Sequence, residues 1–400
     1  MSHRSEASPC LSPPDCRRPV AAAAWSSCSP PASSPRAAGR YPRTSRPRPR
    51  RPRRPRPSSS TTAGPIAPAL ATEAVPDDPD DPAVWRHPTA PARSLILGTN
   101  KIAAPGGALV VFGLDGRIRQ TIAGLDRPNN VDVEYGLALG DRRVDVAIVT
   151  ERLQHRLRLF AIDADTGQLS DLASVPVLEG ETGDRAEPMG IAAYRRPADG
   201  AVFAIVAPKG GGPTGYLAQY RLEGHADGTV TGTLVRRFGH FSERGPAPGE
   251  AGEIEAVVVD DALGWVYYAD ERYGIHKWAA DPDSPDAGRE LAVFGLEGYE
   301  RDREGLAIYA RPDGTGYLVS VDQIPGGSIL RVYRREGRPG APHDHSEVVG
   351  VIRTPADETD GLDVASEAFP GFPHGLVVMM NSGPRDFLVF DWEAVGTGLK

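Results

Sequence analysis

Acidic residues recur along this chain where a short polar segment turns directly into an apolar one. Glu255 precedes Ala-Val-Val-Val, Glu304 precedes Gly-Leu-Ala-Ile, and Asp360 precedes Gly-Leu. Carboxylates brought close together repel one another, and a hard cation relieves that repulsion. Ligand sets made only of oxygen favour Ca²⁺, which binds about six to eight of them. We therefore expect a calcium site, with seven candidate ligands: Asp80, Asp81, Asp132, Glu255, Asp302, Glu304 and Asp360.

Basic residues follow three apolar runs at an equivalent place. The runs LILGTN, DVAIVTE and FAIVAP end in Lys101, Arg152 and Lys209, and a fourth run, VYYAD, ends in Glu271. A single cation at the end of a strand is most simply an exposed charge. The recurrence instead favours a site for a multiply charged anion beside bound calcium, and phosphate is the natural candidate.

Other polar groups have simpler interpretations. Asp77, Asp78, Asp260 and Asp261 are expected to accept backbone N–H groups in turns. The motif His343-Asp-His345 lies in a loop rich in Pro and Gly, and we expect it to be solvated. The chain has no Gly-X-Ser-X-Gly, Walker or His-Glu-X-X-His motif, so serine hydrolase, P-loop and zincin chemistry lack support.

The elements that must position these residues form a repeat. Six units begin with an acidic or amide residue and continue through short, alternating, aromatic-rich runs bounded by Gly and Asp, which is typical of β-strands. Successive units start 49 to 66 residues apart, taking as equivalent Pro82, Val131, Gly190, Ala256, Gly305 and Gly361. Six units of about four strands each predict an all-β, six-bladed β-propeller over residues 75–400. In that fold the first strand of each blade lines a central channel, so the recurrent acids form a ring.

Residues 1–74 have a different composition. They hold 13 Arg, including seven between Arg46 and Arg56, whereas the chain as a whole carries a net charge of −8. Such an Arg/Pro-rich stretch cannot bury a core, and we expect it to be disordered. It could bind nucleic acid, or it could be a solvated linker or an upstream extension of the reading frame. We favour the second interpretation, because the remainder of the chain is acidic.

A membrane span, a signal peptide and cysteine-based sites are not expected. No apolar run is long enough to span a membrane, and no signal peptide is legible. All three cysteines, Cys10, Cys16 and Cys28, lie in the first 30 residues, so no disulfide or thiolate site is expected in the rest of the chain.

The chain from about Val75 to Gly398 resembles the β-propeller phytases, which are alkaline and calcium-dependent. The resemblance rests on an ordered series of runs that includes DDPAVW (80–85), NNVDVEY (129–135), IEAVVVDDALGWVYYADERYGIHKW (254–278), DREGLAIY (302–309) and TDGLDV (359–364).

The resemblance implies a function. The protein would be a monomeric, secreted or periplasmic 3-phytase that hydrolyses phytate, myo-inositol hexakisphosphate, using several Ca²⁺ ions and direct attack by a metal-bridged water. Glu255, Glu271, Asp302 and Glu304 would hold metal and water. Lys101, Arg152 and Lys209, with Asp81, would bind the substrate.

Three departures from the family pattern leave alternatives open. Where the family pattern has a lysine, a tyrosine and an acidic residue, this chain has Ile102, Met189 and Gly210. These replacements remove polar contacts from a neighbouring phosphate subsite. The chain could therefore act on another phosphate ester or bind anions without catalysis. A lactonase with one calcium ion is a further alternative, although such an enzyme would not need the three cations.

Overall fold

The computed structural model describes residues 64–242 and 252–400. Within these ranges the chain forms 24 β-strands, three short 3₁₀ helices and one α-helix, so the expectation of an all-β fold is confirmed. The 3₁₀ helices span Pro91–Arg93, Arg152–Gln154 and Gly183–Arg185, and α1 spans Trp392–Gly396. No helix in the described part of the chain is long and apolar enough to cross a membrane.

Four sheets in the described residues contain four strands each, and a fifth contains eight. The first sheet consists of β2 (Pro79–Trp85), β3 (Leu95–Asn100), β4 (Gly107–Gly113) and β5 (Ile118–Leu125). Two later sheets consist of β14 (Val257–Asp260), β15 (Trp265–Asp270), β16 (Gly274–Ala279) and β17 (Ala292–Phe294), and of β18 (Gly305–Ala310), β19 (Gly316–Asp322), β20 (Ile329–Arg334) and β21 (Val348–Arg353). The last consists of β22 (Leu362–Ala365), β23 (Leu376–Asn381), β24 (Asp386–Asp391) and β1 (Leu70–Ala71).

The eight-stranded sheet joins two runs of four antiparallel strands. One run is β6 (Pro128–Leu139), β7 (Arg142–Glu151), β8 (Arg156–Ile162) and β9 (Leu169–Pro176), and the other is β10 (Pro188–Arg195), β11 (Val202–Pro208), β12 (Thr214–Gly224) and β13 (Val230–His240). A single parallel pair, Gly224 with Leu139, links them. A Cβ atom at Gly224 would lie 2.1 Å from the carbonyl oxygen of Ala138, so this approach requires glycine.

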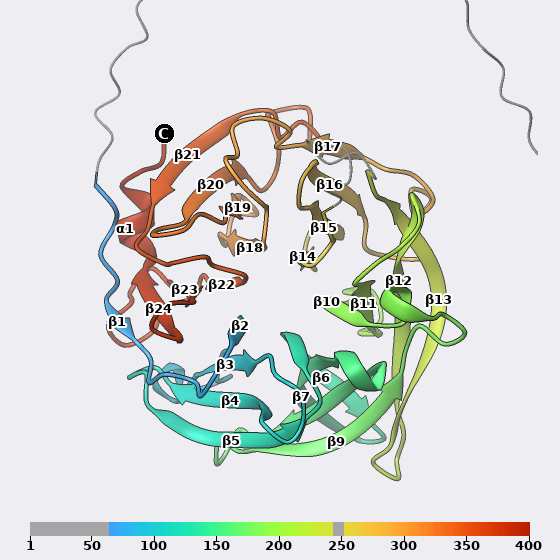
Figure 1. Cartoon of the computed structure of the whole chain (residues 1–400). Coiled ribbons are helices and arrows are strands. Elements are labelled where there is room, and N and C mark those ends of the chain that lie inside the picture. Colours follow the sequence, from blue (N-terminus) through green and yellow to red (C-terminus); the bar gives the residue numbers. More distant parts are fainter. Residues whose placement is uncertain (1–63, 243–251) are drawn as a thin grey trace, which may run out of the picture. The chain divides into compact units, whose positions relative to one another are not determined.

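The sheets stand around a common centre, as in a propeller (Figure 1). The strands β2, β6, β10, β14, β18 and β22 lie innermost, and β5, β9, β13, β17 and β21 lie at the outside (Figure 1). This arrangement confirms the coarser part of the prediction, an all-β, propeller-like fold. The expectation of six separate sheets is not met, because the link between Gly224 and Leu139 merges two of the runs.

Burial explains the character of the strands. All residues of β3, β4 and β23 are buried, because their sheets are covered on both faces, and these strands therefore read as continuous apolar runs. The outermost β5 exposes most of its residues and alternates. Neighbouring sheets share cores; Leu97 and Leu109 of one pack in the same cluster as Val149 and Phe160 of the next.

The first strand of the described chain completes the last sheet. In β1, Leu70 pairs with Val389 and Ala71 with Leu388 of β24. The predicted disordered segment, residues 1–74, was therefore too long at its end, because a short apolar stretch follows the Arg/Pro-rich part. Residues 1–63 of that segment lie outside the described residues.

Candidate functional site

Six backbone amides in the described part of the chain make the same contact directly after β3, β7, β11, β15, β19 and β23. Each donates to the carbonyl oxygen of a residue that precedes the innermost strand of the same run. The pairs are Lys101 with Asp78 (2.7 Å), Arg152 with Arg127 (3.1 Å), Lys209 with Glu187 (2.8 Å), Glu271 with Glu253 (3.2 Å), Gln323 with Asp302 (3.0 Å) and Ser382 with Asp357 (3.0 Å). The contact fixes the point from which each of these six side chains starts, at one end of the ring. We call that end the mouth.

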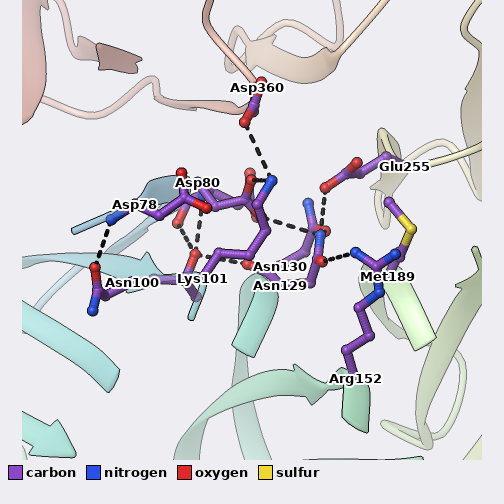
Figure 2. Close-up of polar contacts among 12 residues, drawn as sticks. Asp78, Asp80, Asn100, Lys101, Asn129, Asn130, Arg152, Met189, Glu255 and Asp360 are labelled. Carbon is purple, nitrogen blue, oxygen red and sulfur yellow. Dashed lines mark hydrogen bonds and ion pairs between the residues drawn. The ribbon is translucent and has the colours of Figure 1, made fainter. Parts of the chain in front are cut away.

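Lys101 joins two acids at the mouth. Its ammonium forms an ion pair with the fully buried Asp80, and its Nζ lies 3.3 Å from Oδ2 of Asp360, as Figure 2 shows. Burial alone would lower the pKa of the Lys101 ammonium, but Asp80, Glu255 and Asp360 raise it well above its usual value. Lys101 therefore stays charged at any physiological pH.

Arg152 is the second cation of the mouth and is 5% exposed. Its Nε donates to Oε2 of Glu187 at 2.9 Å. Its Nη1 donates to Oδ1 of Asn129 at 3.2 Å, as Figure 2 shows. The guanidinium is therefore held on two sides before any ligand arrives.

Lys209 differs from these two cations. Its side chain is half-buried, and its ammonium forms no ion pair or hydrogen bond with the residues that the structure describes. Glu253 lies near enough to interact with it. Burial raises the pKa of Glu253, and the positive charges of Lys209 and Arg152 offset part of that rise. Lys209 is thus a cation available to an incoming anion.

Three glutamates gather beside these cations. One carboxylate oxygen each from Glu253, Glu255 and Glu271 lies within 4.8 Å of the other two. Burial raises the pKa of Glu271 to about 8, although the backbone N–H of Glu253 donates to its Oε2 at 2.8 Å. The charges of the neighbouring Glu255 and Glu253 contribute to this rise in pKa.

Glu304 faces the same group. Burial raises its pKa well above the usual value, and Glu271, Glu255 and Asp360 add to the effect. Buried carboxylates at this separation repel one another, and a divalent cation with oxygen ligands relieves such repulsion. The donor set therefore fits a calcium ion. Glu253 was not among the predicted ligands, although it precedes the same apolar run as Glu255.

Asp302 belongs to the mouth but already has a partner. Its Oδ1 lies 2.6 Å from Nε of Arg272, which directly follows Glu271 in the chain. Asp360 likewise accepts from Nε2 of Gln323 at 2.5 Å. The sequence did not single out Arg272 or Gln323, although Gln323 occupies the strand-end position that Lys101 occupies in the first sheet.

Asp81 and Asp132 use their carboxylates differently from the prediction. Oδ2 of Asp81 accepts the N–H of Val131 at 3.1 Å, and Oδ2 of Asp132 accepts the N–H of Ala193 at 2.7 Å. In each case an acid on one innermost strand holds the next innermost strand. The second oxygen of Asp132 accepts the N–H of Val133 at 2.7 Å.

Asp132 lines two cavities. One, of about 290 Å³, is also lined by Arg86, Asp261 and Asp363. The other is also lined by Asp81 and Glu304. Burial raises the pKa of Asp132 to about 7, and the like charges that contribute are those of Asp363 and Asp261. One oxygen of Asp132 thus accepts an N–H of its own strand, β6, and the other accepts an N–H of β10, so its carboxylate joins these two innermost strands.

The histidine motif is also placed differently. His345 is buried rather than solvated, and its Nδ1 lies 2.9 Å from the carbonyl oxygen of Arg334. Its Nε2 lies 3.1 Å from Nζ of the buried Lys277. This motif anchors a loop and is separate from the mouth.

Two of the positions that differ from the family pattern are tightly constrained. Met189 is 3% exposed, and its carbonyl oxygen accepts the hydroxyl of Thr150 at 2.7 Å. The N–H of Gly210 donates to the carbonyl oxygen of Asp184 at 3.0 Å, and a Cβ atom there would lie 3.0 Å from Cβ of Asp184. The loop after Lys209 therefore passes close to residue 184.

The chain is similar to a known family and to several known proteins. A family model described as Phytase matches residues 58–386. The 3-phytase of Bacillus subtilis (strain 168) is 29% identical over 331 residues, which cover 80% of each chain. Among solved structures, BBS1N in complex with ARL6DN has a TM-score of 0.43 and 10% identity, with 78% of each chain covered. A functionally unknown protein from Desulfotomaculum acetoxidans DSM 771 has a TM-score of 0.41 and 17% identity, with 68% of this chain and 74% of that chain covered.

Proposed function

The chain belongs to the phytase family and is a phosphoric monoester hydrolase, and from that premise we propose that it releases phosphate from phytate in a calcium-dependent reaction. One observation supports this proposal above the others. Lys101, Arg152 and Lys209 are grouped with Glu253, Glu255 and Glu271 at one end of the ring. A site with both signs of charge suits a ligand that is itself a calcium complex of a polyanion.

The residues that would hold calcium are those whose carboxylates repel one another. They are Glu253, Glu255, Glu271, Asp302, Glu304 and Asp360. Bound calcium would polarise a phosphate oxygen and lower the pKa of a coordinated water. Asp80 belongs with Lys101 as its counter-ion rather than with this group.

The cations would hold the phosphate oxygens. Lys101 and Arg152 are already fixed by their acidic and amide partners, so little reorganisation accompanies the transfer of charge. Lys209 would bind a further phosphate oxygen. We propose direct in-line displacement, in which the oxygen of water bonds to phosphorus as the bond to the inositol oxygen breaks, without a phosphoenzyme.

Phosphate release from calcium phytate in ¹⁸O-labelled water tests this proposal. One ¹⁸O atom per released phosphate is expected, together with complete loss of release in excess chelator. Turnover that persists in chelator would contradict the calcium dependence, and phosphate transfer to an added alcohol would contradict direct attack by water.

A second substrate class deserves the same assay. Met189 and Gly210 stand where the family pattern has a phenol and an acid, and both are locked by backbone contacts. This favours a weaker second phosphate subsite, so other phosphate esters could compete with phytate. A panel of phosphate esters and lactones separates the possibilities; release from lactones alone would overturn the proposal, and phytate binding without release would indicate a binding protein.

We also propose that the ring has six blades and acts as a monomer. The eight-stranded sheet divides into two four-strand runs at its single linking pair, and the same strand-end contact recurs in all six runs. By family, we further propose that the protein works outside the cytoplasm. Sedimentation of the purified chain and fractionation of producing cells test these points.

A further inference from the structure

We propose that Asn129 is a positioning residue that couples the phosphate-binding Arg152 to the acids Asp80 and Glu255. The inference rests on the function proposed above. Asn129 is fully buried at the start of β6 and lies at the centre of Figure 2. It is uncharged, so its part in the site would be to hold other groups rather than to react.

The side chain of Asn129 faces opposite charges on its two ends. Its Nδ2 donates to Oδ2 of Asp80 at 3.1 Å and also to Oε1 of Glu255. Its Oδ1 accepts Nη1 of Arg152 at 3.2 Å. This arrangement fixes the orientation of the carboxamide, because the reverse would place its oxygen against two carboxylates and its nitrogen against a guanidinium.

The backbone places this side chain by a break in the strand pairing. Pro128 pairs with Glu151 of β7, but the next regular pair is Val131 with Val149, so the register shifts at Asn129 and Asn130. Such irregularities re-aim side chains, and they are frequent beside active sites. The carbonyl oxygen of Asn129 is in turn held by the hydroxyl of Thr99 at 2.6 Å.

Each contact of Asn129 has a consequence for the reaction. Without the Oδ1 acceptor, Glu187 is the one side-chain partner that Arg152 keeps among the described residues, and the orientation in which its guanidinium would meet phosphate is lost. Without the Nδ2 donor, Asp80 and Glu255 lose the hydrogen-bond partner that they share, and the orientation of Glu255 toward the metal is held less firmly. Partners that orient metal ligands in this way typically change metal affinity or activity by about 10–100-fold.

Two variants separate the two contacts. Asn129→Ala removes both, whereas Asn129→Asp keeps an oxygen for Arg152 but removes the donor to Asp80 and Glu255. The matched control is Gln219→Ala. Gln219 is also a fully buried carboxamide that accepts from an arginine, with its Oε1 2.6 Å from Nε of Arg236, but it lies in β12, and its Nε2 donates to Ala280 rather than to a carboxylate.

The experiment measures kcat and KM for calcium phytate, thermal stability, and calorimetric binding of calcium alone. For Asn129→Ala we expect an increase in KM, a decrease in kcat and weaker calcium binding, each by about tenfold. Asn129→Asp should keep a KM near that of the unsubstituted protein while kcat stays low. Gln219→Ala should lower thermal stability and leave KM and calcium binding unchanged.

Two results would overturn the inference. One is a stability loss in Asn129→Ala with unchanged KM and calcium binding; the other is an equal KM for Asn129→Ala and Asn129→Asp. If Asn129→Ala does not fold, the KM of Asn129→Asp decides. If the unsubstituted chain releases no phosphate, the proposed function fails, and the calcium calorimetry still tests the role of Asn129.

Discussion

Nζ of Lys101 lies 3.3 Å from Oδ2 of Asp360, although 259 positions of sequence separate the two residues. Lys101 follows β3 of the first sheet, and Asp360 precedes β22 of the last. Their contact exists because the first and last sheets become neighbours when the ring closes. The mouth is therefore a property of the complete ring rather than of any one sheet.

Replacement of Lys101 by methionine tests the central cation. Lys101→Met keeps most of the side-chain length but removes the charge that would stabilise the phosphate in the transition state. The loss of one such donor typically lowers kcat by about 10²–10³-fold, and we expect a decrease of that size in steady-state assays. Lys400→Met is the matched control, because Lys400 is exposed at the end of the chain. Equal activity of the two variants would contradict the assignment.

Removal of calcium should affect both activity and stability. One carboxylate oxygen each from Glu253, Glu255 and Glu271 lies within 4.8 Å of the other two, and the basic side chains of the mouth offset their repulsion only in part. We expect dialysis against chelator to abolish phosphate release and to lower the melting temperature, with both recovering when calcium is restored. Calorimetry in the two conditions measures the shift, and an unchanged melting temperature would argue against a cation at this cluster.

Arg335 and Asp260 form a buried bidentate pair, with N···O distances of 2.5 and 2.6 Å between a residue after β20 and one in β14. Arg335→Met leaves Asp260 buried without its counter-ion, and we expect a loss of about 3–5 kcal/mol in the free energy of unfolding. Urea denaturation measures it.

Arg119→Met provides the comparison for this pair. Arg119 lies 2.8 Å from Asp115, but the two side chains are 45% and 49% exposed, so a loss below about 1 kcal/mol is expected. Similar losses for Arg335→Met and Arg119→Met would show that burial does not set the cost.

Glu134 should make the stability of the metal-free protein depend on pH. Burial raises its pKa to about 9, against about 4.3 for an unperturbed glutamate. The folded chain thus retains a proton that the unfolded chain has lost, and the stability that this proton contributes is complete below about pH 4 and is lost as the pH rises through about 9. Asp132 and Asp261, with pKa values raised by burial to about 7, act in the same direction.

The variant Glu134→Gln tests this dependence. Glutamine keeps the oxygen that accepts the N–H of Tyr135 but cannot ionise. In chelator, we expect Glu134→Gln to raise the melting temperature by at least about 2 °C at pH 9 and to leave it nearly unchanged at pH 5. An equal shift at both pH values would point to packing rather than to ionisation.

The contribution of β1 can be measured by truncation. A chain that starts at residue 76 lacks Leu70 and Ala71, whose pairing completes the last sheet. It also lacks the hydroxyl of Thr72, which accepts the N–H of Phe387 at 3.0 Å. We expect this chain to melt at a lower temperature and to lose activity, whereas a chain that starts at residue 64 should match the full-length protein. Equal melting of the two truncations would contradict a stabilising role for β1.

The sequence predicted much of this arrangement because strand ends recur regularly. Lys101, Arg152 and Lys209 could be grouped from their places after apolar runs, and all three do follow the second strand of a run. The same reasoning could have included Gln323, since it differs from the others only in lacking a charge.

Other features depend on how neighbouring strands meet, which the order of residues does not contain. Asp132 looked like the other recurrent acids, but the register of β6 against β10 gives its oxygen to Ala193. Asn129 reaches the mouth because of a register shift that no residue pattern signals. Conversely, the Arg/Pro bias of the first residues concealed the short strand β1.

The pairing of β1 with β24 also sets a condition on synthesis. Ala71 leaves the ribosome long before Leu388, its partner, has been made. At about 5–20 residues per second, roughly 16–60 s pass between the two. During that interval the nascent chain presents the open edges of an unclosed ring to proteases and chaperones. The exposure ends only when the last codons, which encode β24, have been translated.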